Sequence, residues 1–262
     1  MKTRSIICIL TAISMTAVHA ATTSIFDDSF SGFNNGNLNS QGNWGSQAAF
    51  SVNNGNVIVT SSSGVFARAQ RFGGFRPEVG DQVRITVSDF AITGSLGIGN
   101  EDFRFGIASS PENTGAQTPQ VYASVAHNAS SLTIGGATDT GYNLGDQLSV
   151  VLTLTRQSSN SWSLESQINN VTDGTSVTGS ATPGNLNGNA GASAGLTLSQ
   201  YLEADSNNKA TFGMRLVGGN TGAQYNIGGV KLETIAVPEP STSISLISAL
   251  TLLILRRGRR TT

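Results

Sequence analysis

The most regular part of the sequence lies between residues 82 and 90, which read Gln82-Val83-Arg84-Ile85-Thr86-Val87-Ser88-Asp89-Phe90. Apolar and polar residues alternate through this stretch. Because successive side chains of a strand point to opposite faces of a sheet, this period of two predicts a β-strand with one buried face. The same alternation, or a β-rich run bounded by turn residues, predicts further strands at Asp102–Ser109, Val121–His127, Ser131–Ile134, Leu148–Arg156, Ser161–Val171, Leu196–Leu202, Ala210–Val217 and Gln224–Thr234.

Turn residues separate these runs. Between Phe50–Val52 and Val57–Val59 lies an Asn54-Gly55 pair, which accepts the positive φ values of a two-residue hairpin turn. A second turn is expected at Asp173-Gly174. Two strands begin alike, with Gly80-Asp81-Gln82 and Gly145-Asp146-Gln147, so we expect one turn geometry to be used twice.

The composition agrees with a chain of short strands. Its 262 residues include 31 glycines and 22 asparagines, which interrupt helices and favour turns. No stretch shows sustained helical periodicity, although Leu198–Ala204 is compatible with a turn of helix. We therefore expect an all-β fold, a single β-sandwich, and exclude helical bundles and coiled coils.

Charged residues are few and unevenly distributed. They make up 12% of the chain, and Ala21–Val237 carries 9 basic and 15 acidic residues, a net charge of −6. This acidic body is not expected to bind nucleic acid or anionic lipid. The single cysteine, Cys8, lies outside the body, which therefore contains neither disulfides nor thiolate metal sites.

Residues 1–20 have the pattern of a secretory signal peptide. Lys2 and Arg4 precede an apolar stretch, and Val18-His19-Ala20 supplies suitable residues before a cut. We expect signal peptidase to cleave between Ala20 and Ala21, so that the chain is exported.

Residues 237–262 form a third segment. It reads Val237-Pro238-Glu239-Pro240-Ser241, then the apolar run Ile244–Leu255, then the arginines Arg256, Arg257, Arg259 and Arg260. As a helix this run would span about 18 Å, less than the roughly 30 Å of a bilayer core. Terminal arginines favour the cytoplasmic side, so the run predicts transient insertion into the inner membrane.

Pro-Glu-Pro, a short apolar helix and a terminal arginine cluster, in this order, resemble the PEP-CTERM sorting signal of Gram-negative bacteria. The resemblance implies that an exosortase, a membrane cysteine transpeptidase, cuts near Val237–Ser241 while the arginines act as a cytoplasmic stop. Proteins with this signal are associated with exopolysaccharide and biofilm matrix, which implies a location in the cell envelope, at the outer surface or in the matrix. A plain tail anchor is the alternative.

Three stretches of the body, Phe26–Phe30, Gly145–Leu152 and Tyr225–Leu232, resemble the concanavalin-like or laminin-G-like jelly rolls. This resemblance implies one jelly-roll domain over residues 21–236. Ala181–Ala194, rich in Gly, Asn and Ala, is expected to be a loop within that domain.

The sequence offers little catalytic machinery. His127 is the one histidine left after removal of the signal peptide, and a histidine at a strand end is more often structural. Glu101 and Asp102 are adjacent, so on a strand they would point to opposite faces, whereas glycoside hydrolysis needs two carboxylates facing one bond. We expect a non-enzymatic protein without catalytic residues.

Two kinds of ligand are weighed for the body. Asp27 and Asp28 could offer oxygen ligands to Ca²⁺, but Gly228-Gly229 stands where related strands carry Asp-Asn, so we expect no metal and no cofactor. Sugar binding would use aromatic faces, and the candidates for stacking are Trp44, Trp162, Tyr122 and Tyr142.

The sequence thus predicts an exported, non-enzymatic surface or matrix protein, sorted by an exosortase and associated with exopolysaccharide. The alternative is a carbohydrate-binding module with the same tail, and a glycoside hydrolase is the third hypothesis. The expected partners are signal peptidase and exosortase for processing, with exopolysaccharide as the ligand of the alternative.

Overall fold

The computed structural model describes residues 20–42, 44–46, 48–60, 66–72, 76–94, 101–108, 121–128, 131–159, 161–181, 198–203, 210–217 and 222–237. Thr22–Ala236 form a compact unit of two β-sheets that face each other across an apolar core. The signal peptide lies outside the described residues except for its last residue, and the sorting tail lies outside them except for Val237. Among the described residues, no helix is both long and apolar enough to span a membrane.

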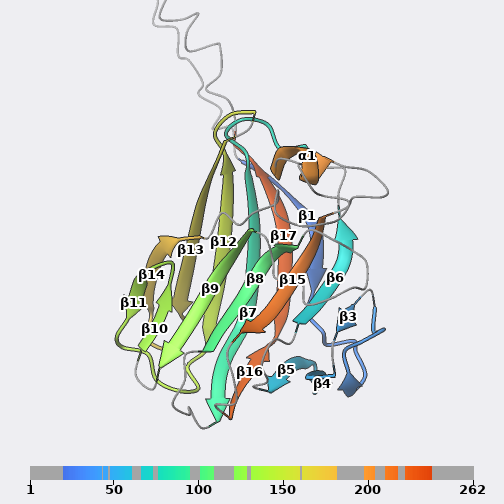
Figure 1. The fold of residues 1–262 in the computed structure, drawn as a ribbon, viewed down its shortest axis with the longest axis vertical. Helices are drawn as coiled ribbons and strands as arrows, with labels where there is room; N and C mark the ends of the chain where they lie inside the picture. Colours follow the sequence, from blue (N-terminus) through green and yellow to red (C-terminus); the bar gives the residue numbers. More distant parts are fainter. Residues whose placement is uncertain are drawn as a thin grey trace, which may run out of the picture. The chain divides into compact units, whose positions relative to one another are not determined.

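The sheet in front in Figure 1 has seven strands, and we call it the front sheet. Its order is β11 (Ala137–Asp139), β10 (Ser131–Ile134), β9 (Val121–Asn128), β8 (Glu101–Ala108), β15 (Ala210–Val217), β6 (Phe66–Phe72) and β3 (Gly45–Ser46). Every recorded pairing in it is antiparallel. The pairing of β8 with β15 joins segments that lie about a hundred residues apart in the sequence, and this pairing positions the candidate site.

The other sheet, the back sheet, has ten strands and branches at β7 (Gln82–Gly94). On one side of β7 lie β12 (Leu148–Arg156), β13 (Trp162–Asn170) and β14 (Thr175–Ser180). On the other side, the first part of β7 pairs with β17 (Gly229–Ala236), which pairs with β1 (Ala21–Asp28). The last part of β7 pairs with β16 (Ala223–Ile227), followed by β5 (Asn56–Thr60), β4 (Phe50–Asn53) and β2 (Gly36–Asn37).

The branch explains why the expected strand Gln224–Thr234 is two strands. Asp89 has a φ of 48° and interrupts the regular ladder of β7. Opposite it, Gly228 separates β16 from β17 and donates its backbone N–H to the Ser88 carbonyl over 3.1 Å. A Cβ at Gly228 would lie 2.5 Å from the Asp89 Cβ, so only glycine fits this crossing point.

The core confirms the alternation seen in the sequence. Val83, Ile85 and Val87 are fully buried, and the inward residues of β8 and β16 belong to the same apolar cluster. The Phe103 ring lies 5.1 Å from the Phe90 ring and 5.7 Å from the Tyr225 ring, measured between centroids. These aromatic contacts join the front sheet to β7 and β16 of the back sheet.

The repeated Gly-Asp-Gln stretches do form one turn geometry twice. The Asp81 carboxylate accepts the Glu78 N–H, and the Asp146 carboxylate accepts the Asn143 N–H, each over 2.8 Å. Gly80 and Gly145 have φ values of 97° and 93°. The Gly80 N–H donates to the Arg156 carbonyl of β12, and the Gly145 N–H donates to the Ile92 carbonyl of β7. Each turn is therefore hydrogen-bonded to the strand that follows the other turn.

Other expectations are confirmed or corrected. The hairpin at Asn54-Gly55 joins β4 to β5, with φ values of 50° and 78°. The strand expected at Leu196–Leu202 is wrong, because the described part is helix α1 (Leu198–Glu203), which buries Leu202. Strands β2, β3, β6, β11 and β14 were not predicted. In β14, polar residues occupy both faces, so no alternation marks it.

Candidate functional site

The outward face of the front sheet carries a cluster of polar and aromatic side chains. On β8, Phe103 and Phe105 point into the core, so Asp102 and Arg104 point outward. The antiparallel ladders place Tyr122 and Ser124 of β9 on one side of β8 and Arg215 of β15 on the other. We call these residues the Arg104 cluster: Asp102, Arg104, Tyr122, Ser124 and Arg215.

Arg104 is the centre of this cluster. Its Nε donates to Asp102 Oδ2 over 2.6 Å, and its guanidinium carbon lies 5.0 Å from the centroid of the Tyr122 ring. Asp102 also accepts a short hydrogen bond from the Ser124 hydroxyl through its other oxygen. The Arg104 and Asp102 side chains are 25% and 19% exposed, so both are held in place yet reachable from solvent.

Arg215 lies directly opposite Arg104 in the ladder between β15 and β8. Burial lowers the pKa of Arg215, the nearby positive charge of Arg104 lowers it further, and Tyr122 acts in the opposite direction. The cluster therefore has two cations and one carboxylate at the surface of the sheet. It can donate several hydrogen bonds from planar guanidinium groups and offers the edge of an aromatic ring beside them.

The four aromatic residues expected from the sequence do not lie together. Tyr122 belongs to the Arg104 cluster, where Arg104 covers part of its ring. Trp44 is buried, and its Nε1 donates to Asp28 Oδ2 over 2.8 Å, while its ring packs against Phe30. Tyr142 is also buried, and Trp162 is half-buried with its Nε1 donating to Ser199 Oγ. Burial therefore removes Trp44 and Tyr142 from any sugar-binding surface.

Of the acidic pair at the start of the body, Asp28 stabilises the fold. Both carboxylate oxygens of Asp28 accept protein hydrogen bonds, one from the Phe30 N–H and one from the Trp44 indole. Asp27 is exposed. Within the described ranges, no group of three or more His, Cys, Asp or Glu side chains could hold a metal ion.

His127 lies between the two sheets. The residue is 5% exposed, and its Nε2 is 2.5 Å from the Tyr225 hydroxyl. Glu101 is the residue opposite His127 in the β8–β9 ladder, and Asp102, the other half of the expected adjacent pair, belongs to the outward cluster. The structure thus separates Asp102 from the buried histidine, because neighbouring positions on one strand face opposite ways.

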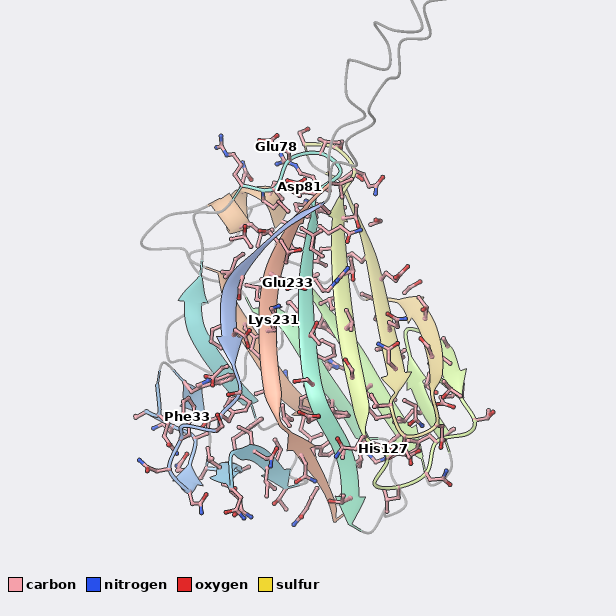
Figure 2. The ribbon with its side chains drawn as sticks, turned by 180° about the vertical axis from the view of Figure 1, so that it is seen from behind. Phe33, Glu78, Asp81, His127, Lys231 and Glu233 are labelled. Carbon is pink, nitrogen blue, oxygen red and sulfur yellow. The ribbon has the colours of Figure 1, made fainter. Side chains whose placement is uncertain are left out.

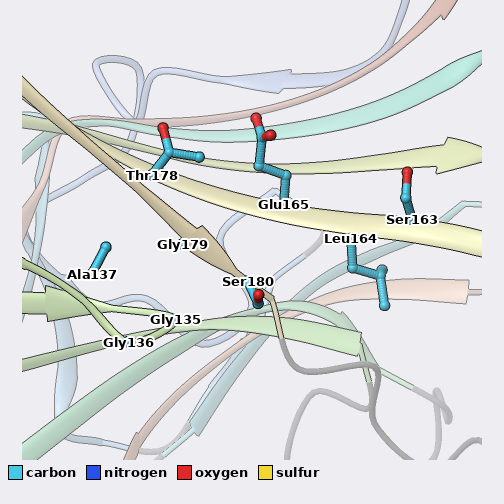
Figure 3. A pocket seen from close by; sticks show the side chains of 9 residues that line it. All are labelled: Gly135, Gly136, Ala137, Ser163, Leu164, Glu165, Thr178, Gly179 and Ser180. Carbon is cyan, nitrogen blue, oxygen red and sulfur yellow. The ribbon is translucent and has the colours of Figure 1, made fainter.

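Elsewhere, the described residues of the body line further hollows. One, of about 560 Å³, is lined by Gly135, Gly136, Ala137, Ser163, Leu164, Glu165, Thr178, Gly179 and Ser180. Figure 3 shows that Glu165 and Thr178 point to one side of their strands and Leu164 to the other. The second, of about 390 Å³, follows the outward face of the back sheet beside Arg84 and Glu233. The side chains of the first hollow supply a single charge, so the Arg104 cluster remains the stronger candidate.

Sequence reasoning missed Arg104, Ser124 and Arg215. Each stands between apolar residues at an outward position of its strand, as Arg104 does between Phe103 and Phe105. That signal marks each residue as surface-facing. Only the register between distant strands brings them into one cluster.

The processing residues Pro238, Glu239, Pro240 and Ser241, and the arginines Arg256, Arg257, Arg259 and Arg260, lie outside the described residues. Val237 is described and 44% exposed. At the other end of the body, Ala20 is exposed, and Ala21 is the first residue of β1.

Comparison with known proteins yields structural similarity at low identity. No protein-family model matches the chain, and no curated protein matches it. Among solved structures, it is similar to the lectin UEA-II complexed with galactose, with 14% identity and a TM-score of 0.49, over 82% of this chain and 100% of that chain. The Emp47p carbohydrate recognition domain has 12% identity and a TM-score of 0.48, over 85% of this chain and 99% of its own. The alginate lyase Aly36B has 9% identity and a TM-score of 0.42, over 82% of this chain and 98% of its own.

Proposed function

We propose that the chain is an exported protein whose β-sandwich binds an extracellular polysaccharide through the Arg104 cluster. The observation that carries this proposal is the half-buried group formed by Arg104, Asp102 and Tyr122 on an outward sheet face. A surface arginine without such contacts would lose much side-chain freedom on binding a ligand. The contacts to Asp102 and Tyr122 already restrain Arg104, which lowers that cost.

The chemistry of the cluster suits a polyhydroxylated ligand. A sugar presents hydroxyl groups that accept and donate hydrogen bonds, together with apolar C–H faces that pack on aromatic rings. Arg104 and Arg215 supply donors, Asp102 and Ser124 supply oxygen acceptors, and Tyr122 supplies a ring. The cluster lies across neighbouring strands of an open sheet, so an extended polymer can follow the face beyond these residues.

A passive surface or matrix protein is the main competing hypothesis. On that hypothesis the Arg104 cluster only solubilises an exposed sheet face. The experiment that separates the two hypotheses is a binding screen of the purified protein on immobilised polysaccharides. We expect retention on a subset of them, and retention lost in Tyr122→Ala but kept in Thr153→Ala on the back sheet. The absence of retention on every polysaccharide would favour the passive protein.

We propose that the protein is not an enzyme, because its histidine is buried and Asp102 is already bonded to Arg104 and Ser124. The bound polysaccharides provide the test. Release of reducing ends, or of unsaturated sugar products, from any of them would contradict this part of the proposal. Loss of that activity in Asp102→Asn would place the reaction at the Arg104 cluster.

Delivery to the cell surface is proposed from the sequence of the tail. Pro238 and Pro240 restrict φ and disfavour helix in the residues before them, so Val237–Ser241 suits the extended binding mode of a processing enzyme. We expect Glu239→Ala to leave an unprocessed precursor in the cell envelope. Mass spectrometry of the mature C-terminus, in strains with and without the exosortase, tests this expectation. An intact Thr262 on the mature surface protein would contradict it.

A further inference from the structure

We propose that the polysaccharide bound by the front sheet is acidic, and that Arg104 and Arg215 hold one of its carboxylate or sulfate groups between them. This inference rests on the proposed carbohydrate-binding function and specifies its substrate class.

The two arginines lie at opposite positions on neighbouring strands. Arg104 and Arg215 are direct partners in the antiparallel ladder, and both point outward because their neighbours Phe103, Phe105, Met214 and Leu216 are fully buried. Directly opposite residues have Cβ atoms about 4.5–5.5 Å apart. Two guanidinium groups starting this close together can both reach one anionic group.

Like charges directly opposite each other on two strands repel each other. Burial lowers the pKa of Arg215, and the positive charge of Arg104 lowers it further, which indicates that the two cations act on each other. An anion held between the two guanidinium groups would be attracted to both, so their position favours a charged ligand over a neutral one.

The planar shape of the guanidinium group also suits an acidic ligand. A guanidinium is planar and its N–H groups match the two oxygens of a carboxylate or sulfate. Because Asp102 and Tyr122 restrain the Arg104 side chain, its donors are partly oriented before binding. Ser124, held by Asp102, provides a hydroxyl oxygen on the neighbouring strand for a sugar hydroxyl.

The net charge of −6 over Ala21–Val237 does not prevent an acidic polysaccharide from binding at the two arginines. Charges separated by more than about 8–10 Å are largely screened at physiological salt. A polyanion therefore responds chiefly to the charges that it touches. The same net charge makes non-specific attachment elsewhere on the body unfavourable, so the arginine pair would determine where an acidic chain binds.

The test compares acidic polysaccharides with their own neutral forms. Purified protein is titrated by calorimetry with polygalacturonate and with alginate, each before and after chemical reduction of its carboxyl groups. We expect binding to at least one native polymer to be at least about tenfold tighter than to its reduced form, since hydrogen bonds to charged groups are worth more than neutral ones. Raising the salt concentration should weaken the binding to the native polymer.

Matched variants place the effect on the sheet. Arg215→Gln and Arg104→Gln should each weaken binding to the native polymer by about tenfold and weaken binding to the reduced polymer less, because hydrogen bonds to a charged group are worth more than those to a neutral hydroxyl. Arg215→Lys should retain part of the affinity, because it keeps the charge without the planar donor group. Arg84→Gln, on the back sheet, is the control and should have no effect. Thermal unfolding of each variant establishes that it is folded.

The outcomes are distinguishable. Equal affinity for native and reduced polymers would overturn this inference and leave the proposed carbohydrate binding intact. Binding to neither form of either polymer would overturn this inference, and only the absence of retention on every polysaccharide of the screen would overturn the proposed function as well. A preference for native polymers that survives in folded Arg104→Gln and Arg215→Gln would also overturn the inference, because the acidic groups would then be held elsewhere.

Discussion

The two sheets of the sandwich carry cross-strand pairs of opposite character on their outward faces. On the back sheet, Arg84 lies directly opposite Glu233, and Lys231 on the same strand is 2.7 Å from Glu233 Oε2. Figure 2 shows Lys231 and Glu233 along β17. On the front sheet, Arg104 lies directly opposite a second arginine. The back-sheet pairing brings opposite charges together, whereas the front-sheet pairing brings two positive charges together, the arrangement from which we propose an anion site.

The largest effect on stability is expected at a glycine beside the Arg104 cluster. A Cβ at Gly106 would lie 2.0 Å from the Val121 carbonyl oxygen, which belongs to the backbone of β9. We expect Gly106→Ala to lower the free energy of unfolding by about 3 kcal/mol, the upper part of the range for overpacked sites. Denaturant unfolding measures it.

Gly229 on the back sheet is the matched control for this prediction. There a Cβ would meet the Ser88 hydroxyl oxygen at 2.8 Å, which can rotate away, and the Asp28 carbonyl oxygen at 3.3 Å. We expect Gly229→Ala to cost about 1 kcal/mol. Equal losses in the two variants would mean that the front sheet tolerates a shift of β9 at this position.

The second prediction concerns a variant in which the front sheet carries an opposite-charge pair, as the back sheet does. Arg215→Glu places a carboxylate opposite Arg104. The affinity for acidic polysaccharide should fall by about a hundredfold, because the new carboxylate repels the ligand. The free energy of unfolding should rise by about 0.5 kcal/mol, since an opposite-charge pair replaces a like-charge pair.

The reverse exchange gives the back sheet a like-charge pair. Glu233→Arg places an arginine opposite Arg84 and should lower the free energy of unfolding by about 1 kcal/mol. Its affinity for polysaccharide should not change. A loss of stability in Arg215→Glu as large as that in Glu233→Arg would show that the arginine pair of the front sheet has no energetic cost to relieve.

The smallest effect concerns Lys231. Its hydrogen bond to Glu233, and the charge of that carboxylate, raise the pKa of Lys231. A raised pKa means that this contact stabilises the fold below the ordinary lysine pKa and that its contribution is lost as pH rises through the raised value. We expect Glu233→Gln to lower the pKa of Lys231, measured by NMR titration of its side chain. An unchanged pKa would mean that the two groups do not interact in solution.

The sequence predicts strands better than it predicts which strands meet. The alternation in Gln82–Phe90 requires only local geometry, and it correctly assigned Val83, Ile85 and Val87 to the core. The two Gly-Asp-Gln turns were also predictable, because their hydrogen bonds within Glu78–Asp81 and Asn143–Asp146 are local. Such features depend on a few consecutive residues.

The candidate site depends on contacts between distant residues. Nothing in the sequence near Arg104 indicates that β15 rather than another strand pairs with β8, and a shift of one residue would send Arg215 to the other face. Burial of Trp44 could not be read from its own surroundings either, because its ring also contacts Phe212 of β15. Strand register therefore explains why Arg104, Ser124 and Arg215 were missed, and long-range packing explains why Trp44 was wrongly expected at a sugar-binding surface.

The most direct test of this account is an NMR titration of the isotope-labelled protein with an acidic oligosaccharide, observing the Nε–Hε groups of its arginines and the rings of its tyrosines. The account predicts saturable shifts at Arg104, Arg215 and Tyr122, with Arg84 unchanged. Saturable shifts confined to Arg84 and its neighbours on the back sheet, or no saturable shift at any arginine, would contradict it.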